Sequence, residues 1–127
     1  MGDVGDLHVG TVVLNVQDMR RAVGFWSAAL GYEPREREWD DAFMMLVDPK
    51  GAGVPVSLQR TDRRPAEPVR GHLDLYTTAR EEHIRRLRDL GATEPAAWPY
   101  PAEHDFVVLR DTEGNEFCVI QRIATGR

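Results

Sequence analysis

The chain has 127 residues, which suits one domain with a core of its own, and its formal net charge is -5. This acidic balance disfavours nucleic-acid binding, because neutralising phosphates requires a concentrated basic face. The single cysteine excludes an internal disulfide and zinc-finger spacing, and it suits a reducing cytoplasm. No apolar run is long enough to span a membrane, and the first residues show no signal-peptide pattern. We therefore expect a cytoplasmic protein with no membrane partner.

The sequence repeats itself at the level of a whole structural module. Residues 11–34, TVVLNVQDMRRAVGFWSAALGYEP, align with residues 72–95, HLDLYTTAREEHIRRLRDLGATEP. Each copy begins with alternating apolar residues, which predict a strand, and continues with apolar residues at helical spacing. The chain therefore contains two copies of one strand–helix unit.

Capping residues predict where each helix begins and ends. In the first copy, Asp18 is the expected N-cap and Gly31 the C-terminal stop. In the second copy, Thr78 and Glu81 form a predicted capping box, and Gly91 ends the helix. Trp26 lies on the apolar stripe of the first helix and is expected in the core.

Three further strands are expected in each copy. Residues 33–39, EPREREW, have the charges of an edge strand that avoids pairing with other chains. The last two strands form a hairpin around a type I turn, DPKG at residues 48–51 and DTEG at residues 111–114. The chain thus reads βαβββ twice within a single domain, residues 1–127. Module one covers about residues 8–60, a polar linker residues 61–70, and module two about residues 71–122.

Alternation along the strands separates an aliphatic face beneath the helices from a mixed face. Phe and Met are poor choices for a face that merely meets water, so the mixed face favours a lined cleft over a solvated surface. This face collects Thr11, Asn15, Ser57, Gln59, His72, Asp74, Tyr76, Glu116 and Cys118, with Phe43, Met45, Phe106 and Val108 from the hairpin strands.

The paired modules, the helix with FW followed by LGY, and DTEGNEF near the C-terminus resemble the vicinal oxygen chelate superfamily. This group includes glyoxalase I, extradiol dioxygenases, fosfomycin-resistance enzymes and bleomycin-resistance proteins. The resemblance covers about residues 8–122. It implies an α+β fold in which two tandem βαβββ modules form a curved mixed sheet around a cleft, with the helices on the outer face. One fold of this kind hosts many activities.

Metal-dependent members of this superfamily take their ligands from the first and last strands of each module. The matching positions here are Thr11, Ser57, His72 and Cys118. Only His72 is a typical ligand for the family, and hydroxyl groups are poor substitutes for carboxylate or imidazole. Because three of these four positions depart from the ligand pattern of the metal-dependent members, we expect that no metal cofactor is bound. A rearranged site that uses His72, Glu116 and Gln59 is the route left open for a divalent metal.

In character the chain is closest to the metal-free glyoxalase-like and bleomycin-resistance-like members, which are homodimers that bind a toxic antibiotic without altering it. Such a crevice needs aromatic planes and a few orienting polar groups. We therefore predict a homodimeric small-molecule-binding protein that sequesters a flat, partly apolar natural product or antibiotic, with no catalytic residue. The predicted ligand-binding residues are Trp39, Phe43, Met45, Gln59, His72, Asp74, Trp98, Tyr100, Phe106 and Cys118.

The alternative function is a glyoxalase-like lyase, isomerase or dioxygenase with an atypical or absent metal site, in which His72 acts as general base next to Asp74. His72 equally suits ligand contact or plain pairing with Asp74 or Tyr76. Trp39 suits a cleft or ordinary packing equally well. Cys118 in a strand is more commonly a small buried residue than a reactive thiol.

Overall fold

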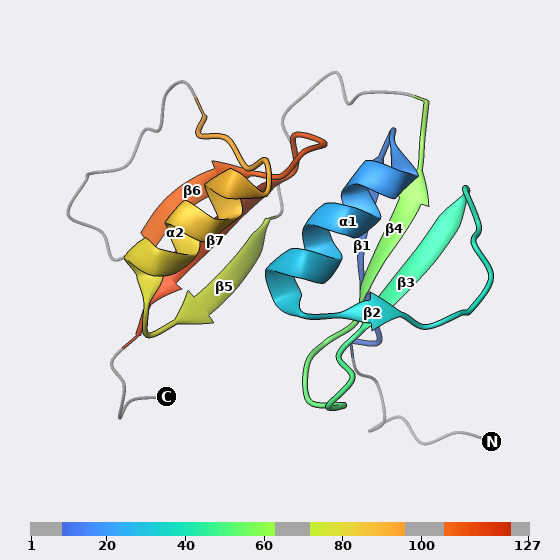
Figure 1. The fold of residues 1–127 in the computed structure, drawn as a ribbon, viewed down its shortest axis with the longest axis horizontal. Helices are drawn as coiled ribbons and strands as arrows, with labels where there is room; N and C mark the ends of the chain where they lie inside the picture. Colours follow the sequence, from blue (N-terminus) through green and yellow to red (C-terminus); the bar gives the residue numbers. More distant parts are fainter. Residues whose placement is uncertain (1–8, 63–71, 96–105, 123–127) are drawn as a thin grey trace. The chain divides into compact units, whose positions relative to one another are not determined.

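A computed structural model describes residues 9–62, 72–95 and 106–122 of the chain. The chain divides into two compact units, Met1–Thr61 and Asp62–Arg127, and each unit is built around its own mixed sheet (Figure 1). The predicted α+β class and the two tandem modules are confirmed. That both units belong to one domain stays a prediction.

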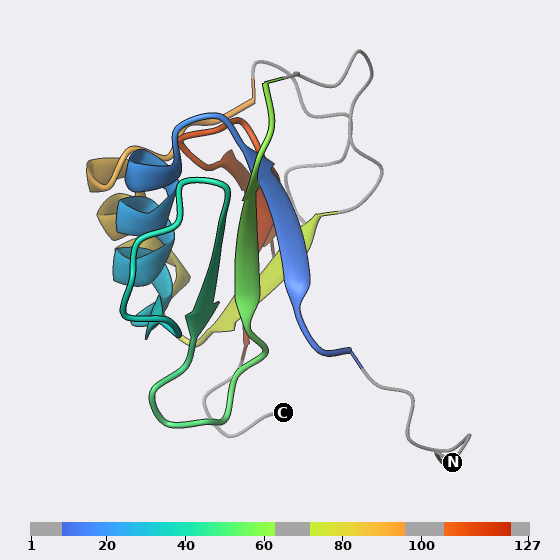
Figure 2. The same cartoon turned by 90° about the vertical axis from the view of Figure 1, so that its right-hand side faces the viewer.

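The first unit contains β1 (Val12–Val16), α1 (Met19–Leu30), β2 (Glu33–Pro34), β3 (Phe43–Val47) and β4 (Val56–Arg60). The sheet order is β1-β4-β3-β2. β1 and β4 are parallel, whereas β3 pairs antiparallel with both β4 and β2. Helix α1 packs on β3 and β4 and covers one face of this sheet (Figure 2).

The ends of α1 form as the sequence predicts. The Arg21 N–H donates to Asp18 Oδ1 at 3.0 Å, so Asp18 is the N-cap. Gly31 has φ +70, the left-handed conformation that glycine adopts at little cost, and its N–H donates to Ser27 O. Trp26 is 1% exposed and packs edge-to-face on Phe25, which confirms its predicted place in the core.

The predicted charged strand over residues 33–39 is wrong for most of its length. Only Glu33–Pro34 forms a strand, and the Arg35 N–H makes a further backbone bond to Met45 O at 2.9 Å. A strand with one face on the core would bury every second one of the charged residues 35–38, which is costly. The chain instead leaves the sheet there and returns at Phe43.

The second unit contains β5 (Leu73–Thr77), α2 (Arg80–Asp89), β6 (Phe106–Arg110) and β7 (Glu116–Gln121), with sheet order β5-β7-β6. β5 runs parallel to β7, and β6 runs antiparallel to it. Helix α2 packs on β7. In the described part of this unit, the counterpart of β2 is the isolated bridge Thr93↔Arg110. Residues 96–105, which include Trp98 and Tyr100, lie outside the described residues.

The predicted capping box of the second helix is also wrong. Helix α2 begins at Arg80 with Ala79 as its N-cap, and no side-chain bond is made by that cap residue. Thr78 precedes the cap, so its hydroxyl is one position too early for the predicted box. Glu81, the other predicted member, pairs with Arg80 at 2.9 Å.

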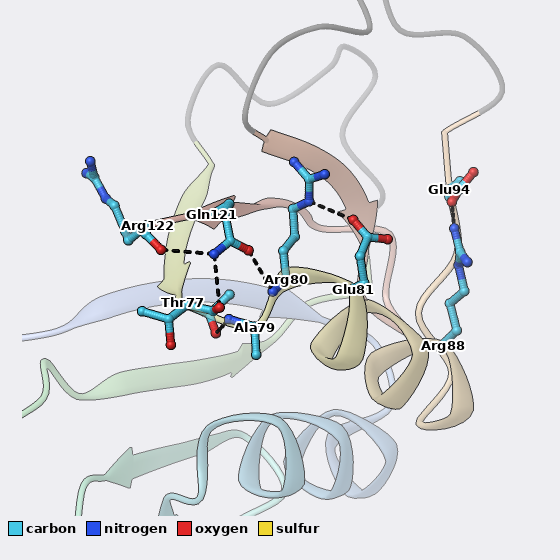
Figure 3. Close-up of polar contacts among 9 residues, drawn as sticks. Thr77, Ala79, Arg80, Glu81, Arg88, Glu94, Gln121 and Arg122 are labelled. Atoms are coloured by element: carbon cyan, nitrogen blue, oxygen red, sulfur yellow. Dashed lines mark hydrogen bonds and ion pairs between the residues drawn. The ribbon is translucent and has the colours of Figure 1, made fainter. Parts of the chain in front are cut away.

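A side chain from β7 takes over the role of the missing cap. Gln121 Oε1 accepts the Arg80 N–H at 3.0 Å, and Gln121 Nε2 donates to Thr78 O at 2.9 Å (Figure 3). The Thr77 hydroxyl accepts the Ala79 N–H at 3.0 Å. The first N–H groups of a helix lack partners within the helix, so Gln121 satisfies one of them from the last strand.

Both predicted hairpin turns are present. The Gly51 N–H donates to Asp48 O at 2.9 Å, and the Gly114 N–H donates to Asp111 O at 3.1 Å. Both glycines have positive φ, +74 and +85. The Asp48 carboxylate accepts three backbone N–H groups of its own turn, and these bonds lower its pKa.

We predict that Gln121→Ala lowers the free energy of unfolding by about 1 kcal/mol, because the Arg80 N–H loses its acceptor. Urea unfolding followed by circular dichroism measures this change. Gln59→Ala is the matched control, since Gln59 is an exposed glutamine near the end of the last strand of the first unit. Equal losses for the two variants would contradict the capping role.

Candidate functional site

The two units present the same backbone positions with different side chains. In the first unit Val13 lies opposite Ser57 across the parallel strands, and in the second unit Asp74 lies opposite Cys118. Because the registers agree, positions can be matched one by one between the units. The matched positions are Thr11, Val13 and Ser57 in the first unit and His72, Asp74 and Cys118 in the second.

In the first unit the matched positions hold neutral hydroxyl groups that bond to each other. Thr11 Oγ1 and Ser57 Oγ are 2.7 Å apart, and Thr11 Oγ1 also lies 3.1 Å from Pro55 O, to which it donates. Ser57 is fully buried. Divalent metals prefer imidazole, carboxylate or thiolate ligands, so this pair does not fit the metal of the wider superfamily.

In the second unit the matched positions hold three side chains able to bind a metal. His72 Nε2 lies 3.1 Å from Asp74 Oδ1, so His72 pairs with Asp74, one of its two expected partners. The ligand atoms of His72, Asp74 and Cys118 all lie within 4.8 Å of one another. Imidazole, carboxylate and thiol together fit a borderline ion such as Zn²⁺, which these three residues can hold.

Cys118 is a buried thiol in an acidic environment. It is 4% exposed in β7. Burial raises the pKa of Cys118 to about 11, and the charge of Asp74, its hydrogen bond and the charge of Glu116 act in the same direction. The thiol is therefore protonated and unreactive at neutral pH in the metal-free protein, in agreement with its interpretation as a small buried residue.

The metal set left open by the sequence differs from this cluster. Glu116 pairs with Arg110 at 3.2 Å, which engages its carboxylate. Among the described residues, His72, Asp74 and Cys118 form the group of His, Cys, Asp and Glu whose ligand atoms lie close enough for one ion. Asp74 is part of this metal-binding cluster, although the sequence predicted it only as a small-molecule ligand contact.

A pocket of about 800 Å³ lies between β3 and the segment 35–41, and we call it the β2–β3 pocket. Its volume falls in the range of about 300–1,000 Å³ that is common for small-molecule sites. Trp39, Phe43 and Met45 all line it, so three of the predicted ligand-binding residues are brought together in one unit.

Trp39 is held in place on one ring face and at its polar edge. The guanidinium carbon of Arg20 lies 4.3 Å from the ring centroid, and the indole N–H donates to Asp41 Oδ1 at 3.1 Å. The side chain remains 37% exposed. Trp39 therefore contacts Arg20 and lines the pocket, and its role as a ligand contact stays a prediction.

The rest of the pocket combines an apolar wall with charged groups. Phe43 is 37% exposed and Met45 is half-buried, with Arg35 Nη1 lying 3.1 Å from Met45 Sδ. Gln59 lies opposite Phe43 in the sheet register and on the same side of the sheet, but it does not line the pocket. Charged side chains of residues 35–41 complete the lining.

The sequence analysis missed these charged residues and Arg20 as parts of a site. It assigned residues 33–39 to an edge strand, where charges need no ligand to explain them. The length of the charged run could have indicated that these residues do not form a strand, because a strand with one buried face would bury some of the charges. Nothing in the local sequence indicated that Arg20, on the surface of α1, would lie over Trp39.

The other predicted ligand-binding residues that the structure describes do not line the β2–β3 pocket: Gln59, His72, Asp74, Phe106 and Cys118. Phe106 lies in β6, half-buried, and opposite Ile120. Trp98 and Tyr100 lie outside the described residues. Their roles as ligand contacts stay predictions, as does the cleft expected from both modules. Neither described helix is long and apolar enough to cross a membrane.

Comparison with solved structures shows the same fold in proteins of low identity. A glyoxalase/bleomycin resistance protein/dioxygenase family enzyme from Burkholderia phytofirmans PsJN is 16% identical, with a TM-score of 0.72 over 91% of this chain and 98% of that chain. The fosfomycin resistance protein FosX from Listeria monocytogenes, complexed with Mn(II) and 1S,2S-dihydroxypropylphosphonic acid, is 14% identical, with a TM-score of 0.70 over 92% and 91%.

FosX from Mesorhizobium loti is 11% identical, with a TM-score of 0.70 over 93% of this chain and 94% of that chain. No curated protein matches the sequence. The model of the family described as "Glyoxalase-like domain" matches residues 11–120. Since this match includes both repeated modules, the chain belongs to the glyoxalase-like domain family, within the vicinal oxygen chelate superfamily.

Proposed function

We propose that the protein binds a flat, partly apolar small molecule, such as a natural product or antibiotic, in the β2–β3 pocket and sequesters it unchanged. The observation that carries this proposal is the gathering of Trp39, Phe43 and Met45 around one pocket of about 800 Å³. Aromatic planes and an apolar wall are what a flat ligand needs in order to leave water.

The geometry of Trp39 supports a stacking role. Its indole N–H is engaged by Asp41 and one ring face by Arg20, so little rotamer freedom remains to be lost on binding. Polar groups of segment 35–41 would orient the ligand at the rim. Among the described residues, the cluster able to hold a metal is His72, Asp74 and Cys118, which does not line this pocket. We propose that binding in the pocket involves no metal.

A resistance-type role is the form of this proposal that we prefer. One structural neighbour bears the family description glyoxalase/bleomycin resistance protein/dioxygenase, and others are fosfomycin resistance proteins. At this low identity the likeness shows the fold alone, and the antibiotic ligand is our own proposal for this chain. We further propose that the protein acts in the cytoplasm, where its single free cysteine stays reduced.

The alternative is a glyoxalase-like lyase, isomerase or dioxygenase. The His72–Asp74 pair at 3.1 Å is the observation that favours it. Asp74 would hold the imidazole at Nε2, leaving Nδ1 to take a proton from a bound substrate. Both side chains are 45% exposed, so a substrate can reach them.

We predict that bleomycin, whose bithiazole rings are flat, quenches tryptophan fluorescence saturably and is recovered with unchanged mass. Trp39→Ala should weaken its binding by about 0.5–1.5 kcal/mol, roughly two- to tenfold in Kd, because a stacking plane is lost. Trp39→Phe should retain most of the affinity, and Tyr76→Ala, an exposed aromatic of the second unit, should leave it unchanged. Fosfomycin, which has no aromatic ring, should bind much more weakly.

Equal Kd values for Trp39→Ala and the parent would refute the proposed site.

His72→Ala separates sequestration from catalysis. If the protein only sequesters, this variant binds bleomycin like the parent, since His72 does not line the β2–β3 pocket. If it is an enzyme with His72 as general base, mass spectrometry detects an altered ligand with the parent, and conversion falls by about a hundredfold or more in the variant. We expect the first outcome.

We also propose a homodimer, as the family resemblance implies. Among the described residues, the exposed large apolar side chains outside the β2–β3 pocket include Val9, Val13 and Val54, which a second copy would cover. Sedimentation equilibrium should give twice the 14.4 kDa chain mass. A mass of one chain across micromolar concentrations would rule the dimer out.

A further inference from the structure

The second unit departs from the first at three matched positions that face the same side of its sheet. His72 and Asp74 are two residues apart, so their side chains project from the same face. Cys118 lies directly opposite Asp74 in the adjacent parallel strand. Where the first unit has Thr11, Val13 and Ser57, the second therefore has imidazole, carboxylate and thiol groups.

We infer that His72, Asp74 and Cys118 form a zinc-type metal site contained in the second unit alone. Asp74, at a position where the first unit has Val13, supplies the ligand that completes the site. This inference does not rest on ligand binding in the β2–β3 pocket, which uses residues of the first unit only.

The observed distances suit this ion. Zinc bonds of about 2.0–2.3 Å in a tetrahedron set neighbouring ligand atoms roughly 3.3–3.8 Å apart. His72 Nε2 and Asp74 Oδ1 are already 3.1 Å apart, and all three ligand atoms lie within 4.8 Å. Closing the remaining gap requires small rotations of His72 and Asp74, both half-exposed, while Cys118 is fixed in a central strand.

The donor set selects the class of metal. Thiolate and imidazole favour Zn²⁺ and Co²⁺, whereas Mg²⁺, Ca²⁺ and Mn²⁺ favour oxygen ligands. Three protein ligands leave a fourth position, which water can fill because His72 and Asp74 are accessible to solvent. The competing interpretation is an exposed His72–Asp74 ion pair beside an inert buried cysteine.

Cobalt binding distinguishes these interpretations. Reduced full-length protein, titrated with Co²⁺ alone, should bind one equivalent and develop a thiolate-to-cobalt charge-transfer band in the near ultraviolet. Zn²⁺ should abolish the band by displacement, and Mg²⁺ should not. Asp74→Asn should weaken Co²⁺ binding by at least about tenfold. Cys118→Ser should remove the charge-transfer band.

His83→Ala is the matched control, because His83 is a histidine of the same unit whose Nδ1 lies 3.1 Å from Arg86 and outside the cluster. It should bind Co²⁺ like the parent. His72→Ala and Asp74→Asn change partly exposed residues, so they test the site even if Cys118→Ser destabilises the fold. Absence of the charge-transfer band in the parent, or undiminished binding by Asp74→Asn, would overturn the site. Bleomycin binding in the presence of EDTA tests the β2–β3 pocket separately.

Discussion

The parallel pairing of the first and last strands within each unit is the constraint on which the matched positions of the two units depend. Parallel neighbours cannot be joined by a tight turn, so each unit needs a crossover helix and a hairpin between the two strands. The resulting register sets Val13 against Ser57 and Asp74 against Cys118. One further backbone hydrogen bond extends each parallel strand pair beyond its last paired residues. In the first unit the Thr61 N–H donates to Val16 O, and in the second unit the Arg122 N–H donates to Thr77 O.

One backbone plan therefore carries two different chemistries. In the first unit, the hydroxyls of Thr11 and Ser57 satisfy each other and leave the face without a charged group at these positions. In the second unit, the imidazole of His72 and the carboxylate of Asp74 lie close together beside Cys118. The hydrogen bonds that build the sheets are made by the backbone, so these side chains are free to differ without changing the fold.

Features set by neighbouring residues were predictable from the sequence, and features set by distant ones were not. Asp18 and Gly31 cap their helix through bonds within four residues, and strand alternation correctly grouped Phe43 and Met45 with Gln59. The start of α2 was mispredicted because Gln121, some forty residues later in the chain, accepts an N–H group at the start of the helix, whereas Thr78 was expected to be the capping residue. The position of Arg20 over Trp39 is likewise a contact between separate elements.

The β2–β3 pocket follows from the same conflict that shortened β2. A strand through residues 35–38 would have buried charged side chains, so the chain leaves the sheet after Pro34 and returns at Phe43. This detour removes the neighbour that would otherwise cover β3, and Phe43 and Met45 stay partly accessible as a result. The displaced segment brings Trp39 and its charged neighbours to the same place. The apolar wall of the pocket is thus provided by β3, and its polar rim by the charged residues that leave the sheet.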